Sequence, residues 1–220
     1  MSALASFLTS SIGRKVSMAI TGLLLIGFLV THMAANLLVL VDAHAYNAYS
    51  HSLVSNPLIY LAEAALLAFF VIHFVSGIVI TLRGRAARTE KYREDRWAGG
   101  TSHKSLASAT MIFSGVFFLV FVPLHILWFK FGTYYDAGGG IRDLHRLVIE
   151  EFQEPMMVAF YVVGMAVLGF HLWHAFGSGL ESLGVTYRKQ LRRAGQLLAV
   201  VIAGGFVLVP VLVFMMGGQP

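Results

Sequence analysis

The chain has 220 residues and a formal net charge of +5, and 57% of its residues are hydrophobic while only 12% are charged. A soluble domain carries about 25% charged residues, so a chain that faces water on all sides is excluded. The chain also lacks cysteine, which excludes thiolate catalysis, cysteine-ligated zinc, iron–sulfur clusters and covalently attached haem. A soluble enzyme, a nucleic-acid-binding protein and a disulfide-stapled secreted domain therefore do not fit.

Five apolar stretches are long enough, at about 1.5 Å per residue, to cross a hydrocarbon core of about 30 Å as helices. They cover residues 16–41, 57–82, 106–129, 155–176 and 197–216. Unpaired backbone groups cannot face lipid, and the alternation of a membrane barrel is absent, which indicates helices. The first stretch is too long for a secretory signal and is interpreted as a retained helix. We expect an all-α integral membrane protein, with residues 1–220 forming one bundle of five transmembrane helices.

The basic residues lie mostly on one side of these helices. Thirteen of the 16 lysines and arginines precede the first helix or lie in the second–third and fourth–fifth connections, against Lys130, Arg142 and Arg146 on the other side. The positive-inside rule predicts a cytoplasmic N-terminus and a C-terminus outside. The inner connection 83–103 is either a solvated loop or a docking surface for a soluble partner. Outside, residues 141–152 have apolar side chains at helical spacing and are predicted to lie on the membrane surface.

Four of the nine histidines lie deep in the predicted helices, one in each of the first four: His32, His73, His125 and His171. Ionisable groups at such depth are costly and either mark functional sites or simply hydrogen-bond across helices. Counted from the charged helix ends, His32 and His125 lie in the outer leaflet, and His73 and His171 lie in the inner leaflet. Two pairs at two matching heights are what two stacked bis-histidine haems require, because a b-type haem needs two axial imidazoles and no cysteine. His174 is the main rival of His171 as a ligand.

Small residues lie about three helical turns from these histidines, at the height of the other pair. They are Thr21 and Gly22 on the first helix, Ser114 and Gly115 on the third, and, two turns from its histidine, Gly164 on the fourth. The helical repeat places them on the same face as the histidine of their helix, where they would leave room for a flat macrocycle.

Several segments together resemble a known family of membrane proteins. They are Ser-Ile-Gly-Arg-Lys at 11–15, His-Met-Ala-Ala-Asn-Leu at 32–37, Ala-Tyr-Asn-Ala-Tyr at 45–49, Ala-Arg-Thr-Glu-Lys-Tyr at 87–92, and His-Leu-Trp-His at 171–174, followed by Leu-Gly at 183–184. With Glu63 and His73 between them, they resemble the b558-type dihaem cytochrome b subunit of succinate dehydrogenase and fumarate reductase, the membrane anchor of complex II. The His-Leu-x-His segment with its spaced Leu-Gly is the most specific motif.

The resemblance implies a ligand set and a role. It implies an outer haem held by His32 and His125 and an inner haem held by His73 and His171, with His171 preferred to His174. It also implies a multi-pass subunit of a bacterial inner (cytoplasmic) membrane. Such a subunit relays electrons between membrane quinone, expected to be menaquinone, and the flavoprotein and iron–sulfur subunits docked on its cytoplasmic face. The enzyme that the resemblance implies, succinate dehydrogenase, belongs to the respiratory chain and the tricarboxylic acid cycle. Its partner subunits, and not the present chain, would oxidise succinate.

The chain departs from the family pattern near the fourth-helix ligand. Members that move protons with the electrons carry Glu two residues before that ligand, where this chain has Gly169. Proton compensation by that route is therefore not expected. Ala175 also stands where Gly is usual, next to Phe176, so local packing is expected to differ.

Charged residues near the helix ends are candidates to bind the cofactors. Haem propionates are anionic, so basic residues at the inner ends would either pair with them or simply snorkel to the interface: Arg14, Lys15, Arg188 and Lys189.

Glu63 is the candidate for quinone or proton chemistry, because it lies ten residues before His73 on the same face, near the outer haem. Four outer-loop residues either extend the proton path or are merely solvated: Asp42, His44, Tyr46 and His51. A quinone site near the inner haem would instead be lined by Ser17 and Thr21.

Three other interpretations stay open. A dihaem cytochrome b subunit of a membrane hydrogenase or formate dehydrogenase would co-purify with that enzyme. A cytochrome b561-type ascorbate or ferric reductase would act without a soluble partner. A small transporter would use the buried histidines as proton relays or ion ligands and would show no haem absorption.

Overall fold

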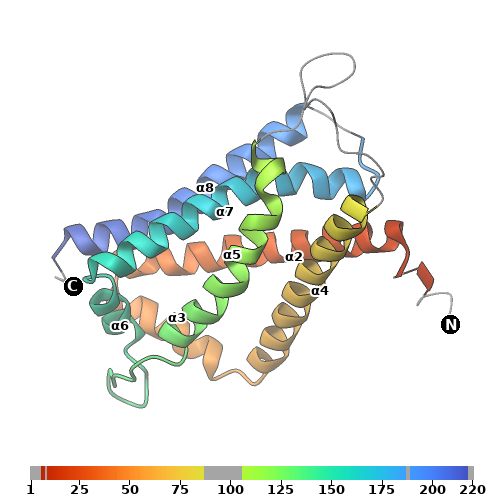
Figure 1. Cartoon of the computed structure of the whole chain (residues 1–220). Coiled ribbons are helices and arrows are strands. Elements are labelled where there is room, and N and C mark those ends of the chain that lie inside the picture. Colours follow the sequence, from red (N-terminus) through yellow and green to blue (C-terminus); the bar gives the residue numbers. More distant parts are fainter. Residues whose placement is uncertain (1–5, 8, 87–105, 187–188, 218–220) are drawn as a thin grey trace.

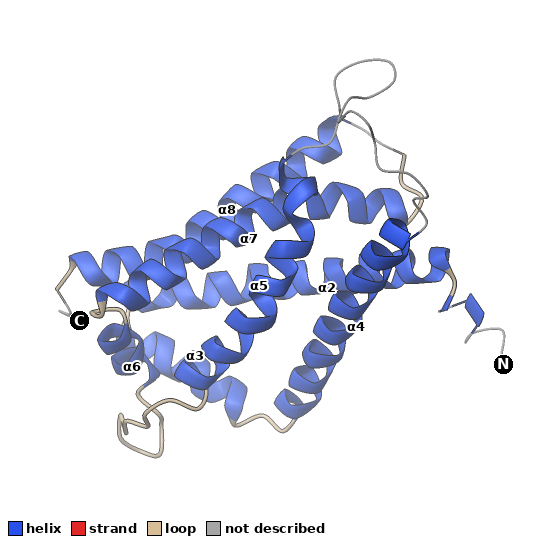
Figure 2. Ribbon diagram, viewed as in Figure 1, coloured by secondary structure: helices blue, strands red, loops and turns tan. Residues whose placement is uncertain are grey.

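The computed structural model describes residues 6–7, 9–86, 106–186 and 189–217, and in these ranges the regular elements are helical apart from one isolated bridge (Figures 1 and 2). In chain order they are α2 (Ser11–Leu37), η1 (Leu38–Leu40), α3 (Ala43–Val54), α4 (Leu58–Ala86), α5 (Leu106–Phe129), α6 (Leu144–Glu151), α7 (Pro155–Ser182) and α8 (Lys189–Met215). Five spans are long and apolar enough to cross a membrane: α2 with η1, and most or all of α4, α5, α7 and α8. In the described ranges the predicted all-α fold is confirmed, with five helices long and apolar enough to span a membrane.

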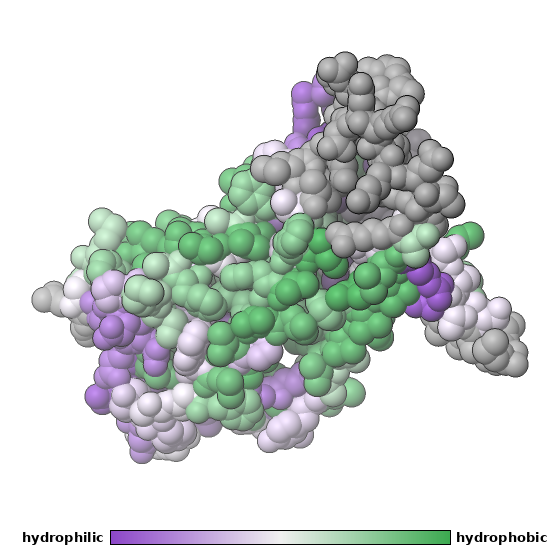
Figure 3. All heavy atoms as spheres, in the orientation of Figure 1, coloured by the Kyte–Doolittle hydropathy of each residue, from purple (hydrophilic) through white to green (hydrophobic). Residues whose placement is uncertain are grey.

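The helices pack unequally. The most extensive contact joins α7 to α8, and α2 packs against α4, α7 and α8, while α5 packs mainly on α7. Helix α4 packs on α2 through its second half, where His73 and Gly77 meet α2, and makes only slight contact with α5, whose ribbon stands apart from it in Figure 1. Figure 3 shows that hydrophobic side chains cover much of the visible face of α4 and α5. Such faces suit lipid, which is as apolar as the side chains themselves.

The helices extend beyond the apolar stretches that predict them. Helix α2 begins at Ser11 rather than at residue 16, because the Ser10 side chain accepts a hydrogen bond from the Gly13 N–H at 2.9 Å and forms the N-cap. Helix α7 runs to Ser182, where Gly184, at φ +86°, ends it in a Schellman motif. Hydropathy marks the part of a helix that crosses lipid, and polar turns then continue it into water.

Close helix contacts depend on small residues. A Cβ on Gly205 of α8 would lie 2.2 Å from the Met33 sulfur of α2, and one on Gly195 would lie 2.7 Å from the Phe176 ring of α7. Small residues at such positions let helix backbones approach closely in lipid. They fix α8 against α2 and α7, the two helices that carry His32 and His171.

The short helices α3 and α6 cover one end of the bundle. Asn47 of α3 donates from Nδ2 to Asp143 Oδ1 at 2.7 Å, and its Oδ1 accepts the His145 N–H at 2.9 Å. His145 also bonds from Nε2 to the Val39 carbonyl at 3.1 Å, which ties α6 to η1. Leu147 and Val148 are almost fully buried. Residues 141–152 thus contain the predicted helix, whose apolar face packs on protein, and their position at the membrane surface stays a prediction.

We predict that Leu147→Ala destabilises the protein by about 2–5 kcal/mol, because Leu147 is only 2% exposed and its loss leaves a cavity under α6. Leu53→Ala is the matched control on α3, because Leu53 is 42% exposed; we expect a change within about 0.5 kcal/mol. Unfolding of the purified protein in detergent, followed by circular dichroism, measures both. Equal losses of stability would contradict the packing of α6 described above.

Candidate functional site

The four intramembrane histidines meet in the two predicted pairs. The ring centroids of His32 on α2 and His125 on α5 are 5.8 Å apart. Those of His73 on α4 and His171 on α7 are 6.3 Å apart. We call the first the outer pair and the second the inner pair, after the predicted topology; the outer pair lies toward α3 and α6. Each pair thus joins two helices that are distant in sequence.

The separation within each pair fits a shared metal ion. Metal–imidazole bonds are about 2 Å long, so two imidazoles on opposite sides of one metal place their centroids about 6 Å apart. Among the described residues, no hydrogen bond joins the rings of either pair, and no group of three or more His, Asp or Glu side chains forms a metal cage. The ligand set of a b-type haem is two axial imidazoles, and the macrocycle fills the remaining positions around the iron.

The His73 ring has a defined tautomer. Its Nδ1 lies 3.0 Å from the backbone carbonyl oxygen of Met18, which can only accept, so Nδ1 carries the proton and Nε2 keeps its lone pair. Gly22 lies directly beside the ring, where an added Cβ would come within 2.9 Å of Cε1. Gly22, predicted from the sequence to clear space at the inner level, therefore does so for the inner histidine itself.

His171 has its Nδ1 partner on a side chain. Its Nδ1 lies 2.8 Å from Ser114 Oγ. The Ser114 hydroxyl has the Met111 carbonyl oxygen at 2.9 Å as an acceptor for its own proton, which leaves its oxygen to accept from a His171 Nδ1–H. In this arrangement both inner imidazoles present an unprotonated Nε2. A second hydrogen bond of this kind orients a metal-binding histidine and raises its basicity.

The outer pair is supported differently. His125 Nδ1 lies 2.8 Å from the hydroxyl of Tyr161 on α7. The His32 ring has only long contacts, at 3.4 and 3.5 Å, with the Asn36 amide, which itself donates to the His32 carbonyl at 2.8 Å. Tyr46 of α3 donates to Asn36 Oδ1 at 3.4 Å. The outer pair is therefore linked to α3 and α7 through side chains alone.

Three helices place the two pairs at separate heights. On α2, Gly22 beside His73 and His32 itself are ten residues apart, which is about 15 Å along the axis. On α7, Tyr161 touches the outer pair and His171 belongs to the inner pair, again ten residues apart. On α5, Ser114 and His125 are separated by eleven residues. The two levels deduced from helix length are thus matched by contacts between helices.

Aromatic rings enclose the outer pair. Phe28 stacks on His32 with centroids 5.1 Å apart, and Phe121 lies parallel to His125 at 6.1 Å. Phe206 of α8 and Phe129 of α5 also approach these imidazoles, at 5.7 and 5.5 Å. Rings of this kind keep the surroundings apolar, which strengthens each remaining hydrogen bond.

Glu63 forms an ion pair that the sequence does not predict. Its carboxylate accepts a hydrogen bond from the Lys130 ammonium at the end of α5. Both side chains are partly exposed. Since Lys130 follows His125 by five residues, the pair lies near the outer level and joins α4 to α5 where those helices have little other contact. Lys130 contributes to the sequence prediction only as a charge that sets the topology.

The other residues expected at the inner level make local contacts, are open or exposed, or lie outside the described residues. Thr21 is buried but donates within its own helix, to the carbonyl of Ser17 at 2.7 Å. A Cβ on Gly115 would meet no atom within 4 Å, so this position is open. Arg14 donates from Nε to the Thr9 carbonyl at 3.1 Å, and Lys15 is exposed. Arg188 and most of the 83–103 connection, with its motif at 87–92, lie outside the described residues.

Two glycines of α7 make room for neighbouring helices, and His174 of the same helix is not joined to either histidine pair. A Cβ on Gly164 would come within 2.7 Å of the Phe121 ring, so Gly164 makes room for a side chain of α5. Gly169 faces Ala203 of α8, where a Cβ would lie 3.2 Å away, and a larger side chain would separate the helices. The His174 ring makes no hydrogen bond or ring contact with either pair in the described chain. The geometry thus favours His171 over His174.

The interpretation of residues 42–51 as a solvated outer loop is wrong, because they form or cap helix α3. Asp42 is its N-cap and accepts from the Ala45 N–H at 2.6 Å. His44 is exposed and His51 is half-buried, whereas Tyr46 is only 6% exposed. Burial raises the pKa of the Tyr46 phenol, so this residue remains a neutral hydrogen-bonding group. Apolar spacing around Tyr46 was too weak to predict the helix.

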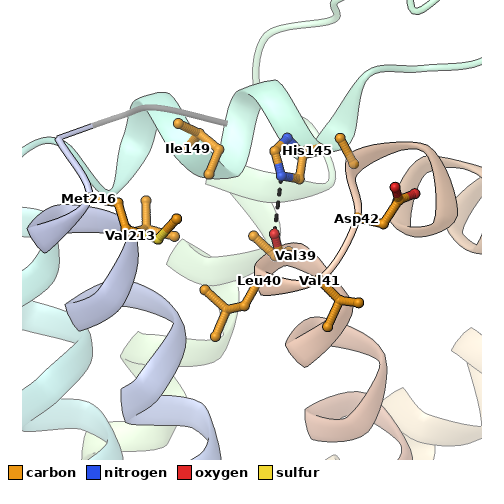
Figure 4. A pocket seen from close by; sticks show the side chains of 9 residues that line it. Val39, Leu40, Val41, Asp42, His145, Ile149, Val213 and Met216 are labelled. Atoms are coloured by element: carbon orange, nitrogen blue, oxygen red, sulfur yellow. Dashed lines mark hydrogen bonds between the residues drawn. The ribbon is translucent and has the colours of Figure 1, made fainter.

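A small pocket lies beside α6, away from the histidine pairs (Figure 4). It is lined by residues of η1, the following turn, α6 and the end of α8, among them Val39, Asp42, His145 and Met216. The dashed bond in Figure 4 joins His145 to the Val39 carbonyl and closes one side of the pocket. None of the four intramembrane histidines lines this pocket, so it is not part of the candidate site.

Comparison with known proteins finds no match for this chain. No protein-family model, no curated protein and no solved structure matches the chain.

Proposed function

We propose that this chain is the dihaem cytochrome b membrane anchor of a succinate:quinone oxidoreductase. One observation carries the proposal: two pairs of intramembrane histidines, each with the spacing of two axial ligands, stand at two levels of one bundle. His32 and His125 would hold the outer haem, and His73 and His171 would hold the inner haem. When bound, the haems supply one-electron redox chemistry across the membrane.

The chain's own groups prepare the histidines for this task. The Met18 carbonyl and the Ser114 hydroxyl accept the Nδ1 protons of the inner pair, so both Nε2 atoms are free to bind a metal. The alternative transporter function would need polar groups along a continuous path. Instead, phenylalanines lie against both rings of the outer pair. Apolar surroundings and a second hydrogen bond that orients the ring favour ligation over proton relay.

The proposed subunit works with soluble partners. Without cysteine, the chain has no ligands for iron–sulfur clusters, and succinate oxidation would belong to the flavoprotein and iron–sulfur subunits on the cytoplasmic face of a bacterial inner membrane. Arg14, Lys15 and Lys189 lie at the helix ends on that side in the predicted topology. There they are candidates to bind inner propionates.

The proposed quinone site lies near Glu63. Its carboxylate and the Lys130 ammonium stand at the outer end of α4 and α5, beside apolar helix faces that a quinone can reach from lipid. In this role Glu63 exchanges a proton with the quinone, for which menaquinone is the expected species, and Lys130 holds the carboxylate in place.

Haem counting in purified protein tests the assignment. We expect two haem b per chain and two steps in an anaerobic redox titration followed by absorption. His32→Ala and His73→Ala should each lose one haem, whereas His44→Ala, an exposed residue on α3, should keep both. A folded but colourless protein, produced with ample haem, would refute the proposal and favour a transporter.

The bound partner separates the remaining dihaem families. Purification from native membranes should yield a flavoprotein and an iron–sulfur protein with succinate dehydrogenase activity. Recovery of a hydrogenase or a formate dehydrogenase instead would reassign the subunit, and a haem protein that works alone would indicate a b561-type reductase.

We predict that Gly22→Leu removes the inner haem and keeps the outer one, because even a Cβ at this position would lie 2.9 Å from the His73 ring. Gly27→Leu on the same helix is the matched control, since a Cβ there meets no atom within 4 Å. Haem content and the two redox steps report the outcome. Loss of haem in both variants would mean that general damage to α2, rather than contact with His73, is responsible.

We predict that Glu63→Gln slows quinone turnover about 100-fold while both haems remain, because the amide cannot exchange a proton. Glu154→Gln, an exposed residue before α7, serves as the control and should leave turnover unchanged. Succinate:quinone activity of the whole complex, measured together with haem content, gives the answer. Normal turnover in Glu63→Gln would exclude this carboxylate from the quinone site.

A further inference from the structure

The hydrogen bond between Tyr161 and His125 is the one close side-chain hydrogen bond to a ring of the outer pair among the described residues. The phenol oxygen lies 2.8 Å from Nδ1, and the tyrosine is only 6% exposed. Its ring is held by aromatic neighbours on three sides, with centroids 5.0 Å from Phe152, 5.2 Å from Phe121 and 5.8 Å from Phe129. The hydroxyl is therefore fixed in place rather than free to rotate away.

The protons determine the direction of this bond. If His125 binds a metal through Nε2, its single remaining proton is on Nδ1, and the Tyr161 oxygen must accept it. Ser114 can accept in the same way at the inner level, where the Met111 carbonyl oxygen at 2.9 Å is an acceptor for the Ser114 proton. The Tyr161 proton has no such acceptor among the described residues. In the described chain, the Tyr161 oxygen thus accepts the His125 proton without a further hydrogen bond from its own O–H to strengthen it.

This bond dominates the support of the outer pair. The partner ligand, His32, has only contacts of 3.4 and 3.5 Å to the Asn36 amide. In the inner pair, by contrast, both histidines have Nδ1 partners within 3.0 Å. A hydrogen bond to Nδ1 raises the basicity of the imidazole, which stabilises ferric over ferrous iron.

We propose that Tyr161 is a positioning residue that, by accepting the Nδ1 proton of His125, lowers the reduction potential of the outer haem. The inference rests on the proposed function, because it requires His125 to be a haem ligand. It assigns a role to a residue that contacts neither iron nor substrate and acts only through the orientation and basicity of His125.

The test compares Tyr161→Phe with two control variants in an anaerobic redox titration. We expect Tyr161→Phe to keep both haems, to raise the potential of the outer haem and to leave the inner one unchanged. A tenfold shift in the reduction equilibrium, which is 59 mV for one electron, is the expected size. Ser114→Ala should shift only the inner haem. Tyr60→Phe, an exposed tyrosine on α4, should shift neither. The variant that lacks His32 identifies the outer signal.

A second variant keeps the test decisive if Tyr161→Phe loses the outer haem. Replacement of Tyr161 by 3,5-difluorotyrosine preserves the shape of the ring and weakens the oxygen as an acceptor, so the potential should rise by a smaller amount. An unchanged outer potential in this variant, or in a Tyr161→Phe protein that keeps both haems, would overturn the inference and leave the proposed function intact. Wild-type protein without haem would overturn both.

Discussion

A polar ring in lipid is costly without partners for its nitrogens, and the arrangement of this bundle around three of its four intramembrane histidines follows from that constraint. Water is absent at this depth, so an imidazole nitrogen without a partner would cost several kcal/mol, about what any unsatisfied polar group costs in hydrocarbon. The protein supplies one partner for His73, His171 and His125 through Nδ1. The ring centroids of each pair then stand 5.8 and 6.3 Å apart, a separation that suits a shared metal ion.

The rest of the fold keeps these rings in register. Glycines let α8 approach α2 and α7, and those two helices carry one member of each pair together with the groups that support the other level. The short helices α3 and α6 close one end, and Tyr46 extends from α3 to Asn36, one turn beyond His32. Packing at the end of the bundle and hydrogen bonding at the histidines are therefore parts of one structure. Helices α4 and α5 contribute a histidine each, and α5 also contributes Ser114, while both keep large exposed apolar side chains.

The pairing of the histidines was predictable because the rise of a helix, about 1.5 Å per residue, converts the sequence position of a residue into its depth in the membrane. Successive transmembrane helices run in opposite directions, so the depths on different helices can be compared. The same calculation would have placed Tyr161 at the level of the outer pair, because it precedes His171 by ten residues, just as Gly22 precedes His32. The Met18 carbonyl was not predictable, since a backbone acceptor has no sequence signature. Helix α3 was missed because its pattern is weak and its stability comes from tertiary contacts. The Glu63–Lys130 pair needed the angle between two helices, which sequence does not fix.

The central claim is that each histidine pair shares one metal ion, and pulsed electron paramagnetic resonance on protein labelled with nitrogen-15 histidine tests it most directly. The account predicts two low-spin ferric haems, each coupled to nitrogens of two histidines, with the centres separated by about 15 Å as the helix rise requires. A haem coupled to one histidine or to none would contradict it, as would a single haem bound between the two levels.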